Sequence, residues 1–316
     1  MSGTTGSGEP LFVHYFTLDV FTGQRFGGNP LAVILDARGL TSDEMLQVTR
    51  EFNYSESTFV LPAETDGTTK RVRIFTPGGE VPFAGHPTVG TAIALVFSGD
   101  APLPADGRGT LQVVLGENVG PVPVTVRVPD GVPDWAQLSV AMMPREQPPL
   151  DRARVASVLQ LDVDDLLPGD THQPRVTSCG LPFLMVPLVS RDAVSRARIH
   201  AERFAAHFHG TDAKMIMVFA AIDDVPGTDL HCRVFCPDDG VPEDPATGSA
   251  TAALGGFLAA RTPRTGTLRW TTQQGVEMGR PSQLEIEVDK SPDGTITAVR
   301  VAGRAVLVSE GRLRVR

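Results

Sequence analysis

Apolar and polar residues alternate over short stretches along most of the chain, which is typical of β-strands. In the first half the strand-like runs cover 11–17, 31–35, 57–61, 71–75, 111–115, 122–128 and 137–140. In the second half they cover 175–177, 183–189, 215–220, 230–235, 267–272, 284–288 and 298–315, the last broken at Gly303 and Gly311. The pattern favours a mixed or strand-rich fold over a helical bundle.

Few segments have the 3.6-residue period of an amphipathic helix. Thr41-Ser-Asp-Glu44 predicts a capping box that opens a helix ending near Asn53, and segments 151–161 and 201–209 are also expected to be helical. Two further segments, 87–97 (PTVGTAIALVF) and 246–260 (ATGSATAALGGFLAA), contain no charged residue. A helix without a polar face is surrounded by protein, so we expect each to lie inside a sheet.

The two uncharged helices belong to an internal repeat. Arg73-Ile-Phe-Thr-Pro77 matches Arg233-Val-Phe-Cys-Pro237 at an offset of 160, and Gly85-His86 matches Gly248-Ser249 at an offset of 163. The repeat predicts two pseudo-symmetric lobes with a cleft between them. Residues 1–145 would form the N-terminal lobe, with a C-terminal strand available to complete it, and residues 146–316 the C-terminal lobe. The Pro-rich segment 144–149 is the linker candidate.

Composition and charge narrow the classes of partner. The formal net charge is −9 and no run of Lys or Arg occurs, which argues against nucleic acid or an anionic membrane and favours a small molecule. No apolar run approaches the ~18 residues of a transmembrane helix, and the polar, glycine-rich first ten residues do not resemble a signal peptide. With three cysteines a disulfide framework is not expected, and we predict a cytoplasmic protein with structural thiols.

Candidate chemistry begins where the two uncharged helices start. Gly85-His86 and Gly248-Ser249 each deliver small residues to a helix N-terminus, where unpaired N–H groups and a partial positive charge attract anions. Two such ends facing one cleft would hold a small anionic substrate. The alternative is that both are ordinary capped helices.

Four titratable residues lie near these loops: Glu80, His86, Glu243 and Asp244. Glu56 stands apart, as a lone acid that leads into an apolar strand. It is either a surface carboxylate at a strand edge or a functional group. A carboxyl group desolvated in an apolar cleft has a pKa raised from ~4.3 toward neutrality, where it can both take and return a proton.

Competing constellations are weaker. Ser249, His86 and Asp244 are the residue types of a hydrolytic triad, but the G-x-S-x-G elbow is absent. The other histidines lack metal-ligand spacing, and neither a P-loop nor a G-x-G-x-x-G after a strand occurs. We therefore expect no metal and no cofactor.

Five ordered blocks resemble the phenazine-biosynthesis PhzF-like family of isomerases. They are Phe26-Gly-Gly-Asn-Pro-Leu-Ala-Val33, Ser55-Glu-Ser-Thr-Phe59, 75–92 (FTPGGEVPFAGHPTVGTA), 235–250 (FCPDDGVPEDPATGSA) and 274–282 (QGVEMGRPS). The resemblance implies an α+β fold of the diaminopimelate-epimerase type. In that fold each of two similar lobes is a mostly antiparallel sheet or barrel around a buried central helix, and the protein is usually a homodimer.

The resemblance also implies roles for individual residues. Glu56 would be the general acid/base, with His86, Asp244 and Ser249 binding the substrate beside Gly85 and Gly248. Related racemases have a cysteine at each helix start, so a two-thiol racemase is not expected here. The predicted function is a cofactor-independent isomerase that moves a proton within a small carboxylate, similar to trans-2,3-dihydro-3-hydroxyanthranilate isomerase. A Ser/His hydrolase and a non-catalytic ligand-binding relative remain as alternatives.

Overall fold

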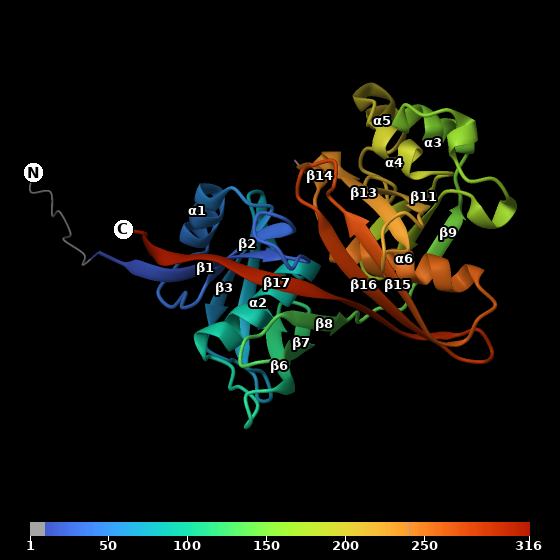
Figure 1. The fold of residues 1–316 in the computed structure, drawn as a ribbon. Coiled ribbons are helices and arrows are strands. Elements are labelled where there is room, and N and C mark those ends of the chain that lie inside the picture. The colour runs from blue at the N-terminus through green and yellow to red at the C-terminus, as the bar shows by residue number, and fades with distance from the viewer. Residues whose placement is uncertain (1–9, 240) are drawn as a thin grey trace, which may run out of the picture.

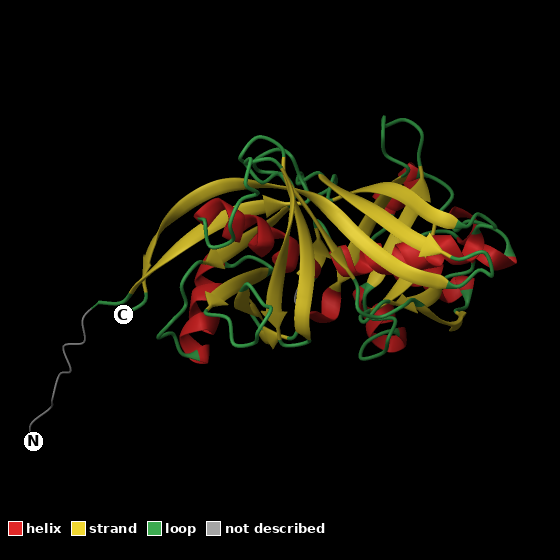
Figure 2. Ribbon diagram, turned by 90° about the horizontal axis from the view of Figure 1, so that it is seen from below, coloured by secondary structure: helices red, strands yellow, loops and turns green. Residues whose placement is uncertain are grey.

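The computed structural model describes residues 10–239 and 241–316, and most of them belong to strands that surround a few helices (Figures 1 and 2). The first half of the chain contains β1 (Phe12–Val20), β2 (Asn29–Ile34), α1 (Ser42–Phe52), β3 (Glu56–Leu61), β4 (Lys70–Thr76), β5 (Gly79–Val81), α2 (Gly85–Ser98), β6 (Gly109–Glu117), β7 (Gly120–Val128) and β8 (Trp135–Ser139). None of the described helices has the length and apolar character needed to span a bilayer.

The second half contains the remaining elements. They are β9 (Arg145–Pro149), α3 (Arg152–Leu159), β10 (Arg175–Ser178), β11 (Pro182–Pro187), α4 (Arg191–Arg196), α5 (Ala201–His207), β12 (Ile216–Ala221), β13 (Leu230–Cys236), β14 (Val241–Asp244), α6 (Gly248–Arg261), β15 (Gly266–Gln274), β16 (Ser282–Lys290) and β17 (Ile296–Arg314), with short 3-10 turns at 163–165, 170–172 and 237–239. The chain is therefore a mixed α+β protein in which strands predominate.

The capping box predicted for the first helix is confirmed. The Thr41 hydroxyl accepts a hydrogen bond from the Glu44 backbone N–H at 3.2 Å, and the Glu44 carboxylate accepts one from the Thr41 backbone N–H at 2.8 Å. The helix ends at Asn53 in the left-handed conformation, which an Asn tolerates better than most residues. Both ends of α1 thus follow from local sequence.

Both uncharged segments form buried helices, α2 and α6. Helix α2 packs against β1, β2, β3, β6, β7, β8 and β17, and α6 packs against β10, β11, β15, β16 and β17. Their glycines allow this close approach. A Cβ at Gly90 would lie 2.6 Å from a Leu31 methyl carbon, and one at Gly255 would lie 2.6 Å from an Ile286 methyl carbon.

The last strand, β17, is continuous, so the breaks predicted at Gly303 and Gly311 are wrong. It pairs with β16, β8 and β1 in turn and runs between the two groups of strands, in red in Figure 1. The glycines make room for rings instead of ending the strand. A Cβ at Gly303 would lie 2.5 Å from the Phe21 ring, and one at Gly311 would lie 2.7 Å from the Tyr15 hydroxyl oxygen.

The predicted linker is also different in the structure. Residues 145–149 form the exposed strand β9, which is antiparallel to β10, with Arg175 opposite Pro149. In the described part of the chain β9 pairs with no other strand. Prolines cannot donate to a ladder but are tolerated on an edge strand, which explains how a Pro-rich segment that looks like a linker can pair.

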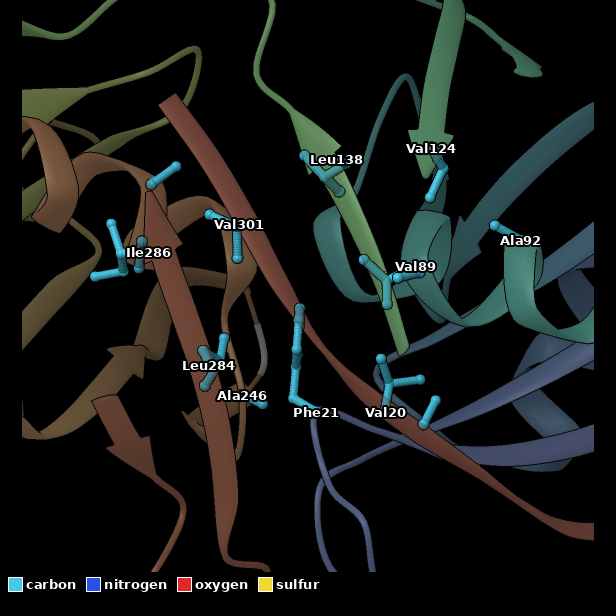
Figure 3. Packing of buried hydrophobic residues seen from close by; sticks show 14 of the residues in the cluster. Val20, Phe21, Val89, Ala92, Val124, Leu138, Ala246, Leu284, Ile286 and Val301 are labelled. Carbon is cyan, nitrogen blue, oxygen red and sulfur yellow. The ribbon is translucent and has the colours of Figure 1, made fainter. Parts of the chain in front are cut away.

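The hydrophobic core continues from one group of strands to the other. Phe21 is fully buried, has a positive φ of 64°, and accepts a hydrogen bond through its carbonyl oxygen from the Gln283 N–H at 2.7 Å. Figure 3 shows its ring between Val20 and Leu284, which belong to opposite ends of the chain. The loop after β1 is therefore anchored to β16.

Candidate active site

Four chain segments that are distant in sequence meet at the candidate site. Strands β2 and β3 are parallel with Leu31 opposite Glu56, so their starting residues lie at the same edge of the sheet. His86 is in the first turn of α2, and Asp244 ends β14 just before α6. The fold therefore brings together the Glu, His and Asp that the sequence nominated.

Glu56 faces His86 in a largely enclosed environment. Their Oε2 and Nε2 atoms are 3.7 Å apart, and the side chains are 19% and 5% exposed. The distance exceeds that of a hydrogen bond, and the buried His86 Nε2 has no hydrogen-bond partner among the described residues. A buried polar nitrogen without a protein partner is costly, so this nitrogen is available to a ligand. The surface-carboxylate interpretation of Glu56 does not fit this burial.

Burial sets the charges of both groups. It raises the pKa of Glu56 to about 8, with a further contribution from the negative charge of Asp244, while a hydrogen bond from Ser55 acts in the opposite direction. Burial lowers the pKa of His86 to about 3. Near neutral pH the imidazole is therefore uncharged, and the Glu56 carboxyl group changes its charge within about one pH unit of neutrality.

Asp244 is held by a hydrogen-bond network. Its Oδ1 accepts a hydrogen bond from Asn29 at 2.9 Å, its Oδ2 accepts one from the Thr247 hydroxyl at 2.5 Å, and its backbone carbonyl accepts one from Gln274 at 2.7 Å. The Ser55 hydroxyl donates to the Asn29 carbonyl oxygen at 3.1 Å, which links the network to the residue beside Glu56. Burial raises the pKa of Asp244 to about 6, against the effect of the Thr247 and Asn29 hydrogen bonds.

Four residues of this network were missed by the sequence reasoning: Asn29, Ser55, Thr247 and Gln274. Each lies inside one of the blocks that carry the family resemblance. Their place in these blocks could have marked them as candidate site residues. The sequence alone could not predict the contact between Asn29 and Asp244, because the two residues are separated by 215 positions along the chain.

The starts of α2 and α6 meet at Gly85 and Gly248. A Cβ on Gly85 would lie 3.2 Å from the Gly248 Cα and 3.4 Å from the backbone nitrogen of Ser249. Neither Ala84 nor Thr247, the two N-cap residues, supplies a side-chain cap, and neither first turn contains an acidic residue. Among the described residues Gln274 Oε1 accepts from the Thr247 N–H at 3.2 Å, and neither N-cap side chain caps its own helix, so the two positive helix ends lie side by side in an arrangement that favours an external anion.

The other nominated residues are less central. Ser249 is half-buried in the first turn of α6, and the absence of a hydrogen-bond partner on His86 Nε2 means that the Ser–His pair of a hydrolase is not formed in the described residues. Glu80 and Glu243 pair with arginines instead of facing Glu56. The described residues contain no cluster of three or more His, Cys, Asp or Glu side chains that could hold a metal ion.

Replacing Gly85 with alanine tests the contact between the helix starts. The added methyl group would press on Gly248 backbone atoms, which cannot rotate away, so we expect the free energy of unfolding to fall by about 1–3 kcal/mol. Denaturant unfolding would measure the change. Gly78→Ala is the matched control, because its nearest non-neighbouring atom would be 3.5 Å away. Equal stability of the two variants would contradict the close approach.

Comparison with known proteins identifies the family of the chain. The family model of phenazine biosynthesis-like proteins matches residues 18–311. An uncharacterized isomerase of Mesorhizobium japonicum is 36% identical, with 95% of this chain and 98% of the relative covered. The trans-2,3-dihydro-3-hydroxyanthranilate isomerase of Pseudomonas aeruginosa is 33% identical, with 94% and 98% covered.

Solved structures of the same family have a similar fold. The crystal structure of a PhzF-family phenazine biosynthesis protein from Bacillus anthracis superposes with a TM-score of 0.84 at 25% identity, covering 96% of this chain and 99% of the other. Fold and relatives together define an isomerase of a small substrate. The chain belongs to the phenazine biosynthesis-like (PhzC–PhzF) family.

Proposed function

We propose that this protein is a cofactor-independent isomerase that moves a proton between two carbon atoms of a small carboxylate, with Glu56 as the single general acid/base. The observation that carries the proposal is the buried Glu56 carboxyl group, 3.7 Å from an unpartnered His86 nitrogen and close to Asp244. A carboxyl group with a pKa near the working pH both removes and returns a proton efficiently.

The proton balance needs no second reactant. The ionised Glu56 carboxylate removes a proton from one carbon, the electron pair moves through the conjugated system of the substrate, and the Glu56 acid returns the proton to another carbon. Neutral His86 hydrogen-bonds the substrate and relays protons. Ionised Asp244 accepts a hydrogen bond from a substrate hydroxyl or amino group, and Ser249 with the adjacent helix N–H groups binds the carboxylate.

The substrate would resemble trans-2,3-dihydro-3-hydroxyanthranilate, the compound in the name of the Pseudomonas aeruginosa relative. It carries the carboxylate, amino and hydroxyl groups that these residues are suited to bind. The two paired helix starts support this choice, since they provide one concentrated positive region at Gly85 and Gly248.

The proposal includes the predicted arrangement of the molecule. Residues 1–145, completed by the later part of β17, and residues 146–316 would be two pseudo-symmetric lobes, each around one buried helix, with the substrate cleft between them. Pairing of β17 with β1 supports this division. The protein would act as a homodimer in the cytoplasm. Its three free cysteines fit a reducing compartment, and light scattering after size-exclusion chromatography would test the dimer.

The test is incubation with trans-2,3-dihydro-3-hydroxyanthranilate in heavy water, with no cofactor added, followed by mass spectrometry. We expect conversion of the substrate with solvent deuterium at carbon. Binding without deuterium uptake would favour the non-catalytic relative. Labelling of Ser249 by a fluorophosphonate probe would favour the hydrolase and contradict the isomerase.

A further inference from the structure

The same arginine–glutamate pair precedes each of the two buried helices. Before α2, the Arg73 Nε and Nη2 atoms donate to the Glu80 Oε1 and Oε2 atoms at 2.8 and 2.6 Å. Before α6, the Arg233 Nε and Nη2 atoms donate to the Glu243 Oε1 and Oε2 atoms, both at 2.8 Å. Each pair is a two-pronged bridge that joins the strand entering a hairpin to the strand leaving it.

The two bridges are equivalent members of the internal repeat. Arg73 and Arg233 are 160 positions apart, and Glu80 and Glu243 are 163 positions apart, which are the offsets found for the motifs themselves. Each guanidinium also lies over an aromatic ring two residues later, Phe75 at 5.1 Å and Phe235 at 4.8 Å. The repeat thus extends from sequence to a specific side-chain arrangement.

The bridges differ in what else the arginine holds. Arg233 Nη1 donates to three backbone carbonyl oxygens at and just after the end of α4, those of Val194, Ser195 and Ala197, at 3.2, 3.1 and 2.9 Å. A cation at a helix C-terminus is favourable, and this side chain is only 4% exposed. The second bridge therefore fixes a buried point between three elements.

The first bridge is more exposed. Arg73 Nη2 donates to the Ser42 hydroxyl at 3.0 Å near the start of α1, and its side chain is 21% exposed. Glu80 and Glu243 each lie five positions before the glycine that starts the helix, but only Glu243 is followed directly by a nominated site residue, Asp244. The two bridges are matched in geometry but unequal in their connection to the candidate site.

We infer that Arg233 and Glu243 are positioning residues that hold the Asp244 backbone, and with it the start of α6, in the geometry the site requires. The effect on turnover rests on the function proposed above, and the effect on local structure does not. A bidentate bridge restricts the direction of the Glu243 side chain and so of the adjacent residue, whose two carboxylate oxygens must reach Asn29 and Thr247 together.

The test compares Glu243→Gln with Glu80→Gln in the full chain. Each change removes the negative charge of the glutamate and one of the two hydrogen bonds that it accepts from the arginine, while the shape of the side chain is kept. Amide hydrogen exchange followed by mass spectrometry should be at least tenfold faster in peptides covering 243–250 of the Glu243→Gln variant. The Glu80→Gln variant should stay within twofold of the unmodified protein in those peptides. Unchanged exchange at 243–250 in a folded Glu243→Gln protein would overturn the inference.

Arg233→Lys provides the second variant, because it keeps the buried positive charge but loses the fork. If geometry matters, it should show the same faster exchange at 243–250, and its kcat on the isomerisation substrate should fall at least tenfold with a smaller change in KM. Normal exchange and normal kcat in Arg233→Lys would mean that charge alone suffices, which contradicts positioning by the bridge. If the unmodified protein has no isomerase activity, the proposed function fails, and the exchange result still decides the role of the bridge.

Discussion

Replacing Glu56 with glutamine is expected to lower the rate of proton transfer by a factor of about 10² to 10⁴, the usual contribution of a positioned acid/base. The amide has nearly the same shape as the carboxyl group, so it keeps the packing against His86. It cannot accept and return a proton near neutral pH. Deuterium uptake into trans-2,3-dihydro-3-hydroxyanthranilate in heavy water would measure the loss.

Glu51→Gln is the matched control for this experiment. Glu51 is an exposed glutamate on α1, so the same chemical change there should leave the rate within twofold of the unmodified protein. Retention of full activity by Glu56→Gln would mean that another group moves the proton, and the proposed mechanism would be wrong. An unchanged kcat with an increased KM would assign Glu56 to substrate binding alone.

Local patterns predicted much of the fold because the physics that decides them is local. The Thr41–Glu44 capping box and the left-handed Asn53 need only neighbouring residues, and both ends of α1 were predicted correctly. The two uncharged helices were also predictable, since a helix with no polar face has no place except inside a protein.

Glycine and proline misled the prediction where tertiary contacts decide their role. Gly303 and Gly311 look like strand breaks, but inside β17 they leave space for the Phe21 and Tyr15 rings. Segment 145–149 looks like a linker, but an unpaired edge of β10 accepts it as β9. In each case the deciding partner is far away in sequence, and the same local residues are compatible with either outcome.

At the candidate site, too, local sequence predicted some features and tertiary packing decided the others. The residue types were predictable, but the sequence left Glu56 equally open to a surface role and a functional one. Only packing distinguishes the two, through a side chain that is 19% exposed and 3.7 Å from His86. Asn29 could not be connected to Asp244 without the fold, because the contact forms between the start of β2 and the end of β14.

The Glu56→Gln substitution should also stabilise the protein at alkaline pH. The pKa of Glu56 is raised from 4.5 to about 8 in the folded state, so between these values the folded protein binds more protons than the unfolded chain. The free energy of unfolding must then fall as the pH rises through this window. Glutamine has no proton to lose. It should therefore raise the free energy of unfolding by roughly 4 kcal/mol at pH 8 but by less than about 1 kcal/mol at pH 5.

Denaturant unfolding of both proteins at pH 5 and pH 8 would measure this difference, with Glu51→Gln, the same change at an exposed position, as the control. An equal effect of Glu56→Gln at the two pH values would show that the carboxyl group is not desolvated in the fold. The two predictions for this residue have opposite signs, because burial that brings the Glu56 pKa into the working range also makes its ionised form unfavourable in the folded protein. A group whose removal both increased alkaline stability and slowed proton transfer would be present for its chemistry, since its ionised form lowers the stability of the fold.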